Sequence, residues 1–187
     1  MNDAANRTDD ELLRRMASGC EESFVILYRK NSPGVYRFAL RMCGSAEIAD
    51  EVTQEVFLFL LRSPSSFDPR KGQFAAWLLG VARNCALRVI ERDRRYIAVE
   101  DEQLESASGA NVLNDLARGE TIESLRAAVL ALPPHYREAV VLCDLEEMSY
   151  EQAAAVIQCA VGTVRSRLHR ARAILHEKLT VKAGCES

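Results

Sequence analysis

Apolar residues recur at intervals of three and four positions along most of this 187-residue sequence, and that spacing is typical of helices. The clearest series lies near the C-terminus, where the steps are three, four, three and four: Val161, Val164, Leu168, Ala171 and Leu175. We find no strand-like alternation and no internal repeat. Glycine and proline are scarce, at 9 and 5 residues, which also favours helix. The sequence therefore predicts an all-α fold.

Start and stop signals divide the N-terminal half into helical stretches. The first is expected over about 9–18, and the second over 21–43, with Gly44 ending it. Ser32 and Pro33 form an N-cap followed by proline at a first helical position. The stretch 21–43 is therefore either one bent helix or two.

Two more helices are expected before the middle of the chain. The stretch 45–62 is predicted to bury Ile48, Val52, Val56 and Phe59. A loop rich in serine and proline follows, and a helix at about 73–95 then carries an apolar stripe. Trp77 lies within this stripe, which favours core packing over a role as a wedge that stacks on bases.

The C-terminal third has the pattern of a helix-turn-helix. An apolar seam, Ile122, Leu125, Val129 and Leu132, precedes a break at "LPP", and Pro134 is placed to open a helix at about 134–145. Ser149 and Gln152 form a capping box for a short helix. A turn at Gln158–Val161 then leads into the helix that carries the C-terminal series.

Charge is segregated along the chain, although the formal net charge is only −3. Residues 83–95 hold five arginines against two acids, a net of +3, and residues 161–178 have a net of +4. Residues 100–120 hold six acids against one arginine. Because local fields govern binding to a polyanion, the two basic stretches are candidate nucleic-acid surfaces. The stretch 97–118 has no sustained apolar period and is predicted to be a flexible acidic linker.

The last predicted helix places its apolar seam on one side and arginines on the other. The seam would hold the helix to its own domain, while guanidinium groups suit forked contacts to phosphate and to guanine. A solvated helix whose arginines pair with acids elsewhere is the alternative. The capped helix just before it, and the lack of nearby acids, favour nucleic-acid binding.

A longer segment that contains this pattern resembles the −35 binding domain, region 4, of extracytoplasmic-function sigma factors in the sigma-70 family. The phrases "LPP..RE", "SYEQ.A" and "VGTVRSRLHRAR" match in order and spacing. The N-terminal half resembles region 2 of the same family through "LYRKNSPGVYRFALRMCG", "DEVTQEVFLFL" and "FAAWLLGVARNCAL". Together these matches cover most of the chain outside the linker and both ends.

The resemblance implies two small helical domains and a set of partners. Region 2 is expected at 1–96, the linker at 97–118, region 4 at 119–180 and a tail at 181–187. The implied partners are promoter DNA, core RNA polymerase, through the clamp helices of its largest subunit and its flap, and an anti-sigma factor. The implied setting is the bacterial cytoplasm, without membrane insertion, and no cofactor or catalytic activity is expected.

The resemblance also implies roles for particular residues. Docking to core polymerase is expected at Asp50, Glu51, Gln54 and Glu55. Recognition and melting of the −10 element are expected at Ser66, Phe67, Arg70, Lys71, Arg83, Asn84 and Arg88. Contacts to the −35 element are expected at Thr163, Arg165, Ser166, Arg167, His169, Arg170 and Arg172. Among the last group, Arg167 and Arg172 are expected to be phosphate clamps.

Three positions depart from the family pattern. Gln158 and Ala160 stand in the helix-turn-helix turn where relatives often have glycine and proline. Polar residues adopt positive φ at modest cost, so we expect slight strain at Gln158. Arg88 stands where many relatives have aspartate, which adds positive charge beside the −10 surface.

Other functional classes have less support. The six cysteines are scattered without a CxxC pair, and no histidine lies at metal-ligand spacing, so we expect inert, reduced thiols rather than redox or metal sensing. No metal cluster, nucleophile–base pair or glycine-rich phosphate loop suggests an enzyme. A repressor or activator of helix-turn-helix type would bind DNA alone and would need no docking helix. A further hypothesis is that the linker acids Glu100, Asp101, Glu102 and Glu105 shield the cationic helices.

Overall fold

The computed structural model describes the backbone of residues 8–101 and 117–184, and the side chains of residues 8–93 and 122–180. Every regular element within these ranges is helical, as the apolar spacing predicts. The side chains of the predicted linker and tail, and with them the proposed shielding acids and Cys185, lie outside the described residues. None of the described helices is long and apolar enough to span a membrane.

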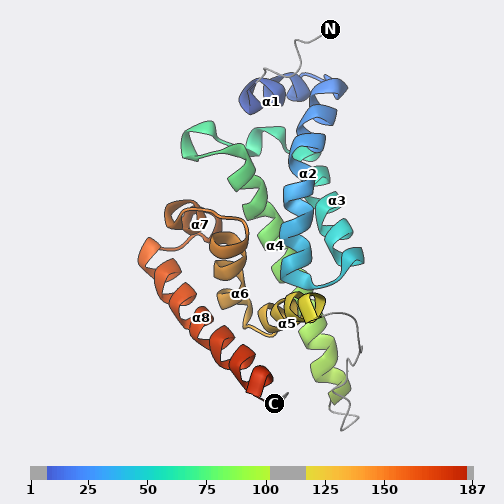
Figure 1. Cartoon of the computed structure of the whole chain (residues 1–187). Helices are drawn as coiled ribbons and strands as arrows, with labels where there is room; N and C mark the ends of the chain where they lie inside the picture. Colours follow the sequence, from blue (N-terminus) through green and yellow to red (C-terminus); the bar gives the residue numbers. More distant parts are fainter. Residues whose placement is uncertain (1–7, 102–116, 185–187) are drawn as a thin grey trace.

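Residues 8–101 contain four α-helices (Figure 1): α1 (Asp9–Ala17), α2 (Glu21–Cys43), α3 (Ala46–Arg62) and α4 (Phe74–Asp101). Two short 3₁₀ turns, η2 (Pro64–Ser66) and η3 (Pro69–Lys71), connect α3 to α4. The question left open by Pro33 is resolved, because α2 is one continuous helix with Pro33 inside it. The helix α4 continues beyond residue 95, where the sequence pattern ended it.

The C-terminal half is also helical and ends in the expected helix-turn-helix. Its elements are α5 (Ala117–Leu130), α6 (Pro134–Val140), η4 (Val141–Leu145), α7 (Tyr150–Ile157) and α8 (Val161–Gly184). Pro134 opens α6, and the π-helical turn η4 extends that helix to Leu145. The capping box is confirmed: the Ser149 hydroxyl accepts from the Gln152 backbone N–H, and the Gln152 side chain accepts from the Ser149 N–H.

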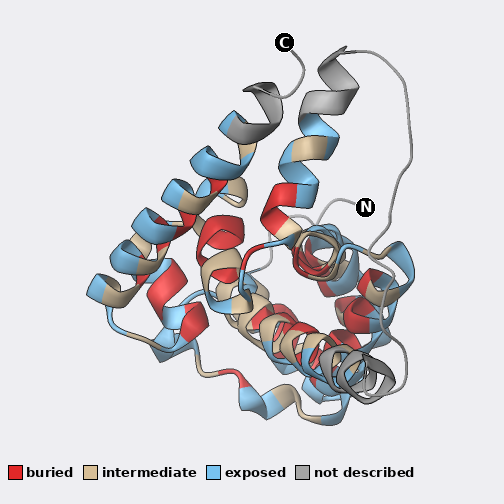
Figure 2. Ribbon diagram, turned by 90° about the horizontal axis from the view of Figure 1, so that it is seen from below, coloured by how far each residue is buried: buried red, intermediate tan, exposed pale blue. Residues whose placement is uncertain are grey.

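The buried faces of the helices meet in one apolar core, which Figure 2 shows in red. The helix α3 contributes Val52 and Val56 as predicted, but the prediction of a buried Phe59 is wrong, since that side chain is 38% exposed. Leu60, which is fully buried, takes its place. Neighbouring helices pack on the face of α3 that contains Val56 and Leu60, and Phe59 lies at its edge, 6.2 Å from the ring of Trp77.

The predicted seam of α5 is correct only at its C-terminal end. Val129 and Leu132 are buried, whereas Ile122 is 52% exposed and Leu125 is 40% exposed. The helix α5 packs against α2, α6 and α8, and Ile122 and Leu125 lie outside the fully covered part of this contact. Helical periodicity therefore identified the apolar face but not how much of it is covered.

The two halves of the chain pack against each other. The helix α7 lies along α4, and α5 and α6 contact the C-terminal part of α2 (Figure 1). At this junction, Gly44 ends α2 with a left-handed φ of +78°, and its backbone N–H bonds to the Leu40 carbonyl. A Cβ atom built on Gly44 would lie 2.7 Å from Cδ1 of Leu130 on α5.

Substituting Gly44→Ala is expected to destabilise the protein by about 1–2 kcal/mol through the left-handed conformation alone. The displacement of Leu130 adds to this cost. Urea unfolding followed by circular dichroism measures the change. Gly34→Ala is the matched control, because Gly34 lies inside α2 and the nearest side-chain atom to an added Cβ is 3.9 Å away. Equal stability of the two variants would show that Gly44 is not required for the turn.

Candidate nucleic-acid interface

The helix-turn-helix places α8 by a buried seam. Val164, Leu168, Ala171 and Leu175 are all buried, which confirms the predicted face. The turn before α8 contains Gln158 at φ +60° and ψ +49°, so a non-glycine residue does adopt the left-handed conformation there. Because the buried seam holds α8 to its own half of the chain, the opposite side of the helix is available to a ligand.

The outward side of α8 is polar and mainly cationic. Arg165, Ser166, His169, Arg170 and Arg172 are exposed, while Thr163 and Arg167 are half-buried. The Arg165 guanidinium lies over the ring of Tyr150, 5.7 Å from its centroid. Within the described residues, no acid forms an ion pair with Arg170 or His169. The structure therefore groups these residues on the side of α8 that faces away from the buried seam.

The expectation that no acids lie near this helix is wrong. The Arg167 Nη1 donates to Oε1 of Glu138 on α6 at 2.7 Å, and the Glu138 side chain is only 1% exposed. The Arg172 guanidinium makes two hydrogen bonds to Asp144, at 3.1 and 2.6 Å. The two arginines assigned to phosphate clamping are therefore those that acids of their own half already neutralise. Helix packing brings in acids that lie 28 and 29 positions away in sequence.

The loop before α4 holds the predicted −10 residues in different environments. Ser66, Arg70 and Lys71 are exposed, whereas Phe67 is only 9% exposed and lines the cavity beside this loop, and its expected role in holding a flipped base stays a prediction. Its ring packs against Phe74 at 5.3 Å and Trp77 at 5.7 Å between centroids. Arg70 pairs with Asp68 at 3.0 Å, and this hydrogen-bonded pairing lowers the pKa of the Asp68 carboxyl.

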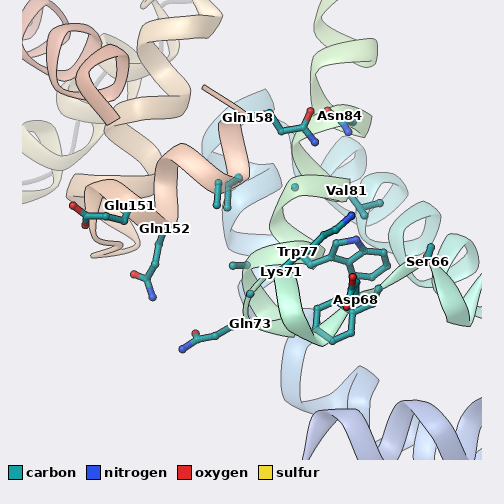
Figure 3. A pocket seen from close by; sticks show the side chains of 16 residues that line it. Ser66, Asp68, Lys71, Gln73, Trp77, Val81, Asn84, Glu151, Gln152 and Gln158 are labelled. Carbon is teal, nitrogen blue, oxygen red and sulfur yellow. The ribbon is translucent and has the colours of Figure 1, made fainter. Parts of the chain in front are cut away.

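A cavity of about 580 Å³ lies between this loop, α4 and α7 (Figure 3). One wall carries Ser66, Lys71 and Asn84, and the facing wall on α7 carries Glu151 and Gln152. Trp77 lines the cavity and also stacks on Phe74, with 5.8 Å between the ring centroids. It is therefore packed against the core on one side and accessible from the cavity on the other.

Two arginines of α4 are engaged by carboxylates. The Arg83 Nε donates to Oε2 of Glu138 at 2.6 Å, so this predicted DNA contact is half-buried and paired. Arg88 Nη2 donates to Glu55 on α3 at 2.6 Å, and both side chains are largely exposed. Arg88 therefore joins the predicted −10 surface to the predicted docking surface. Asn84, between them in sequence, remains exposed.

The predicted docking residues form one exposed face of α3. Asp50, Glu51, Gln54 and Glu55 are all exposed. Leu58 and Leu61, 47% and 46% exposed, continue this face at helical spacing from Glu51 and Gln54. The sequence analysis did not identify these two leucines, although each lies seven positions, or two helical turns, after a predicted docking residue. The face is therefore acidic at one end and apolar at the other.

Glu138 is a third residue of the candidate site that the sequence analysis did not identify. One carboxylate accepts from Arg83 of α4 and Arg167 of α8, and so connects three helices. The position of Glu138 in its helix was the one sequence signal that could have predicted its burial. Glu138 lies on the same side of its helix as Leu142, a buried face, and a buried carboxylate requires cationic partners.

The described cysteines are free thiols, and no group of three or more potential metal ligands occurs among the described residues. The pKa of Cys20 is lowered, first by a hydrogen bond from the Ser23 hydroxyl at 3.3 Å and also by Arg15. Burial raises the pKa of Cys43 to about 11. The two thiols therefore differ in the fraction present as reactive thiolate.

Iodoacetamide at neutral pH is expected to alkylate Cys20 at least about tenfold faster than Cys43, because the thiolate is the nucleophile. Raising the pH should narrow the ratio, since Cys43 gains thiolate over a range in which Cys20 is already ionised. Peptide mapping by mass spectrometry measures both rates in the same sample. Faster labelling of Cys43 would contradict the assigned environments.

Comparison with known proteins finds two family models in this chain. The model of sigma-70 region 2 matches residues 27–96, and that of sigma-70 region 4 matches residues 122–175. The chain is 37% identical over 159 residues to the ECF RNA polymerase sigma factor SigE of Mycolicibacterium smegmatis, covering 82% of this chain and 60% of that relative. It is 36% identical to the ECF RNA polymerase sigma factor EcfG of Rhodopseudomonas palustris, covering 80% of this chain and 81% of that relative.

A solved structure has the same arrangement. The sigma factor RpoE of Bartonella quintana, in complex with the anti-sigma factor NepR, matches with a TM-score of 0.67 at 25% identity. The match covers 86% of this chain and 98% of that one.

Proposed function

Since the chain belongs to the extracytoplasmic-function group of the sigma-70 family, we propose that it directs core RNA polymerase to promoters with particular −35 and −10 elements and opens the −10 element. The observation that carries this proposal is the exposed cationic face of α8, held in place by its buried seam. Such a face suits contacts to phosphates and base edges in a major groove. We expect the protein to act as an initiation factor in the bacterial cytoplasm, where strand opening uses binding energy alone.

The proposed −35 contacts are divided between base edges and phosphates. Arg165, Ser166, His169 and Arg170 face outward and are assigned to base edges or nearby phosphates, with Thr163 at the start of the helix. Arg167 and Arg172 are assigned to phosphates. The ion pairs with Glu138 and Asp144 orient these guanidinium groups. Each carboxylate also offsets part of the positive field of its arginine, so we expect Arg167 and Arg172 to contribute modestly to DNA affinity.

Arg170→Ala and Arg172→Ala should separate these two roles. Loss of a base-reading arginine is expected to cost about 1–3 kcal/mol and to relax specificity at one position, whereas loss of a phosphate contact should weaken binding to all sequences and reduce the salt slope by about 1. Fluorescence anisotropy with a panel of −35 duplexes at several salt concentrations measures both. If both losses proved independent of sequence, the assignment of Arg170 would be wrong.

The proposed −10 surface comprises the loop before α4 and the outward side of α4. Ser66, Lys71 and Asn84 line the cavity and are placed to contact an unpaired base and its phosphates. Arg70 and Arg88 add positive charge at its margins. Phe67 also lines the cavity, and its ring packs against Phe74 and Trp77. Arg83 is available to DNA only after it leaves Glu138.

The proposed docking surface is the exposed face of α3 with Asp50, Glu51, Gln54 and Glu55, extended by Leu58 and Leu61. Acidic and amide groups suit a basic helical partner, as expected of the clamp helices of the largest polymerase subunit, and exposed leucines add apolar contact area. Region 4 is expected to contact the flap. We further propose control by an anti-sigma factor, because the similar RpoE of Bartonella quintana was solved in complex with one.

Run-off transcription with core polymerase on a panel of −35 and −10 sequences tests the function. We expect transcripts from a subset of promoters, only when both core polymerase and this protein are present. A conventional repressor or activator would bind duplex DNA alone and would give no transcripts with core polymerase. Absence of binding to core polymerase, or binding without initiation on any promoter, would refute the proposal.

A further inference from the structure

Three arginines of α8 are held by side chains of their own half of the chain, in two chemically different ways. Arg167 and Arg172 each donate to a carboxylate, at 2.7 and 2.6 Å. Arg165 instead places its guanidinium carbon over the ring of Tyr150, 5.7 Å from the ring centroid. A cation within about 6 Å of an aromatic centroid is attracted to the face of the ring. This contact joins the start of α7 to the start of α8.

The two kinds of contact leave different parts of an arginine available. A carboxylate occupies N–H donors at the edge of the guanidinium group, whereas an aromatic ring covers one face of it and leaves the donors at the edge uncovered. Among the side chains that the structure describes, no carboxylate forms an ion pair with Arg165 and no acceptor takes a hydrogen bond from it. The ring therefore restrains the orientation of Arg165 without using its donors.

Both partners of this contact belong to well-anchored helices. Tyr150 is the first residue of α7, directly after the N-cap Ser149, and the capping box with Gln152 fixes this first turn. The Tyr150 side chain is half-buried and packs against the apolar core. Arg165 directly follows Val164, which is fully buried in the seam of α8. Side chains supported in this way can hold a binding group in one geometry.

We propose that Tyr150 is a positioning residue that holds the Arg165 guanidinium for a forked contact to a guanine of the −35 element. This inference rests on the proposed function, because it requires α8 to enter the major groove. Arginine reads guanine through paired hydrogen bonds to O6 and N7, which need the donors at the edge of the guanidinium group. A side chain that is already oriented loses less conformational entropy on binding. Tyr150 acts through Arg165 and needs no DNA contact of its own.

Nuclear magnetic resonance of the free, full-length chain tests the contact without DNA. An aromatic ring current shields protons that lie above the ring, so we expect the Arg165 Nε–H resonance upfield of its ordinary position in wild type. Tyr150→Phe keeps the ring and should keep this shift. Tyr150→Leu keeps apolar packing without the ring and should abolish it. The same Arg165 resonance in all three proteins would overturn the inference and leave the proposed function untouched.

Fluorescence anisotropy with −35 duplexes tests the role of the contact in recognition. For each guanine, discrimination is the Kd of the duplex with that guanine replaced, divided by the Kd of the parent duplex. Arg165→Ala is expected to lower discrimination at one guanine by about 5- to 150-fold. Tyr150→Leu should lower it about two- to fivefold at the same guanine. Tyr150→Phe should keep the wild-type value. Tyr136→Leu is the matched control, since Tyr136 is half-buried on α6 and its ring contacts His135, and it should also keep that value.

A double variant separates positioning from a general effect on folding. With Arg165→Ala already present, Tyr150→Leu is expected to cause no further loss of discrimination. If Tyr150→Leu weakens binding to every duplex equally, or still lowers discrimination in that background, its role is structural and the inference is overturned. Loss of discrimination in Tyr150→Phe would assign the role to the hydroxyl and also overturn it.

The wild-type protein distinguishes failure of this inference from failure of the proposed function. Equal binding of wild type to every −35 duplex would refute the proposed −35 recognition together with the role of Tyr150. A wild-type preference that Tyr150→Leu leaves unaltered would refute the positioning role alone.

Discussion

Replacing Glu138 with leucine is expected to lower the free energy of unfolding by about 3 kcal/mol. Removing one partner of a buried ion pair typically costs about 3–5 kcal/mol, because the remaining charge is left buried without compensation. Glu138 leaves two such charges, Arg83 and Arg167, whose side chains are 17% and 26% exposed. Their partial access to water places the expected loss at the lower end of that range.

Urea unfolding followed by circular dichroism measures this change, with Asp144→Leu as the matched control. Asp144 also pairs with an arginine of α8, but its side chain is 28% exposed and that of Arg172 is 56% exposed. Exposed pairs contribute up to about 1 kcal/mol, so the control should lose much less stability. Equal losses in the two variants would show that burial of Glu138 does not determine its contribution.

Replacing Glu51 with lysine is expected to abolish transcription with core polymerase while leaving the fold intact. Placing a like charge opposite a basic partner costs several kcal/mol, and about 1.4 kcal/mol corresponds to each tenfold change in affinity. We therefore expect affinity for core polymerase to fall by at least about 100-fold. Because Glu51 is exposed, stability should change by no more than about 0.5 kcal/mol.

Competition for core polymerase measured by fluorescence anisotropy, together with run-off transcription, tests this expectation. Glu123→Lys is the matched control, since Glu123 is exposed on α5, outside every proposed surface, and the charge change is identical. Leu58→Ala and Leu61→Ala should show smaller losses if the apolar end of the same face contributes. Undiminished binding by Glu51→Lys would place the docking surface elsewhere on the molecule.

Much of the fold follows from local sequence signals. The capping box at Ser149, the proline that opens α6 and the glycine that ends α2 all act within a few residues, and all three behave as predicted. The buried series on α8 is likewise a property of helix geometry. The burial of individual residues was less predictable: Phe59, Ile122 and Leu125 are exposed, because exposure depends on what packs against a helix face.

The same distinction between local sequence signals and tertiary packing applies to the candidate site. The sequence by itself determined which helices carry cations and acids, because spacing along a helix sets the side on which each residue lies. Only the tertiary structure decided which of those charges are available. Arg83 and Glu138 are 55 positions apart, and their pairing arises from the packing of the C-terminal half, mainly through α7, against α4. Periodicity describes one helix at a time, whereas an ion pair between helices depends on how the whole core packs.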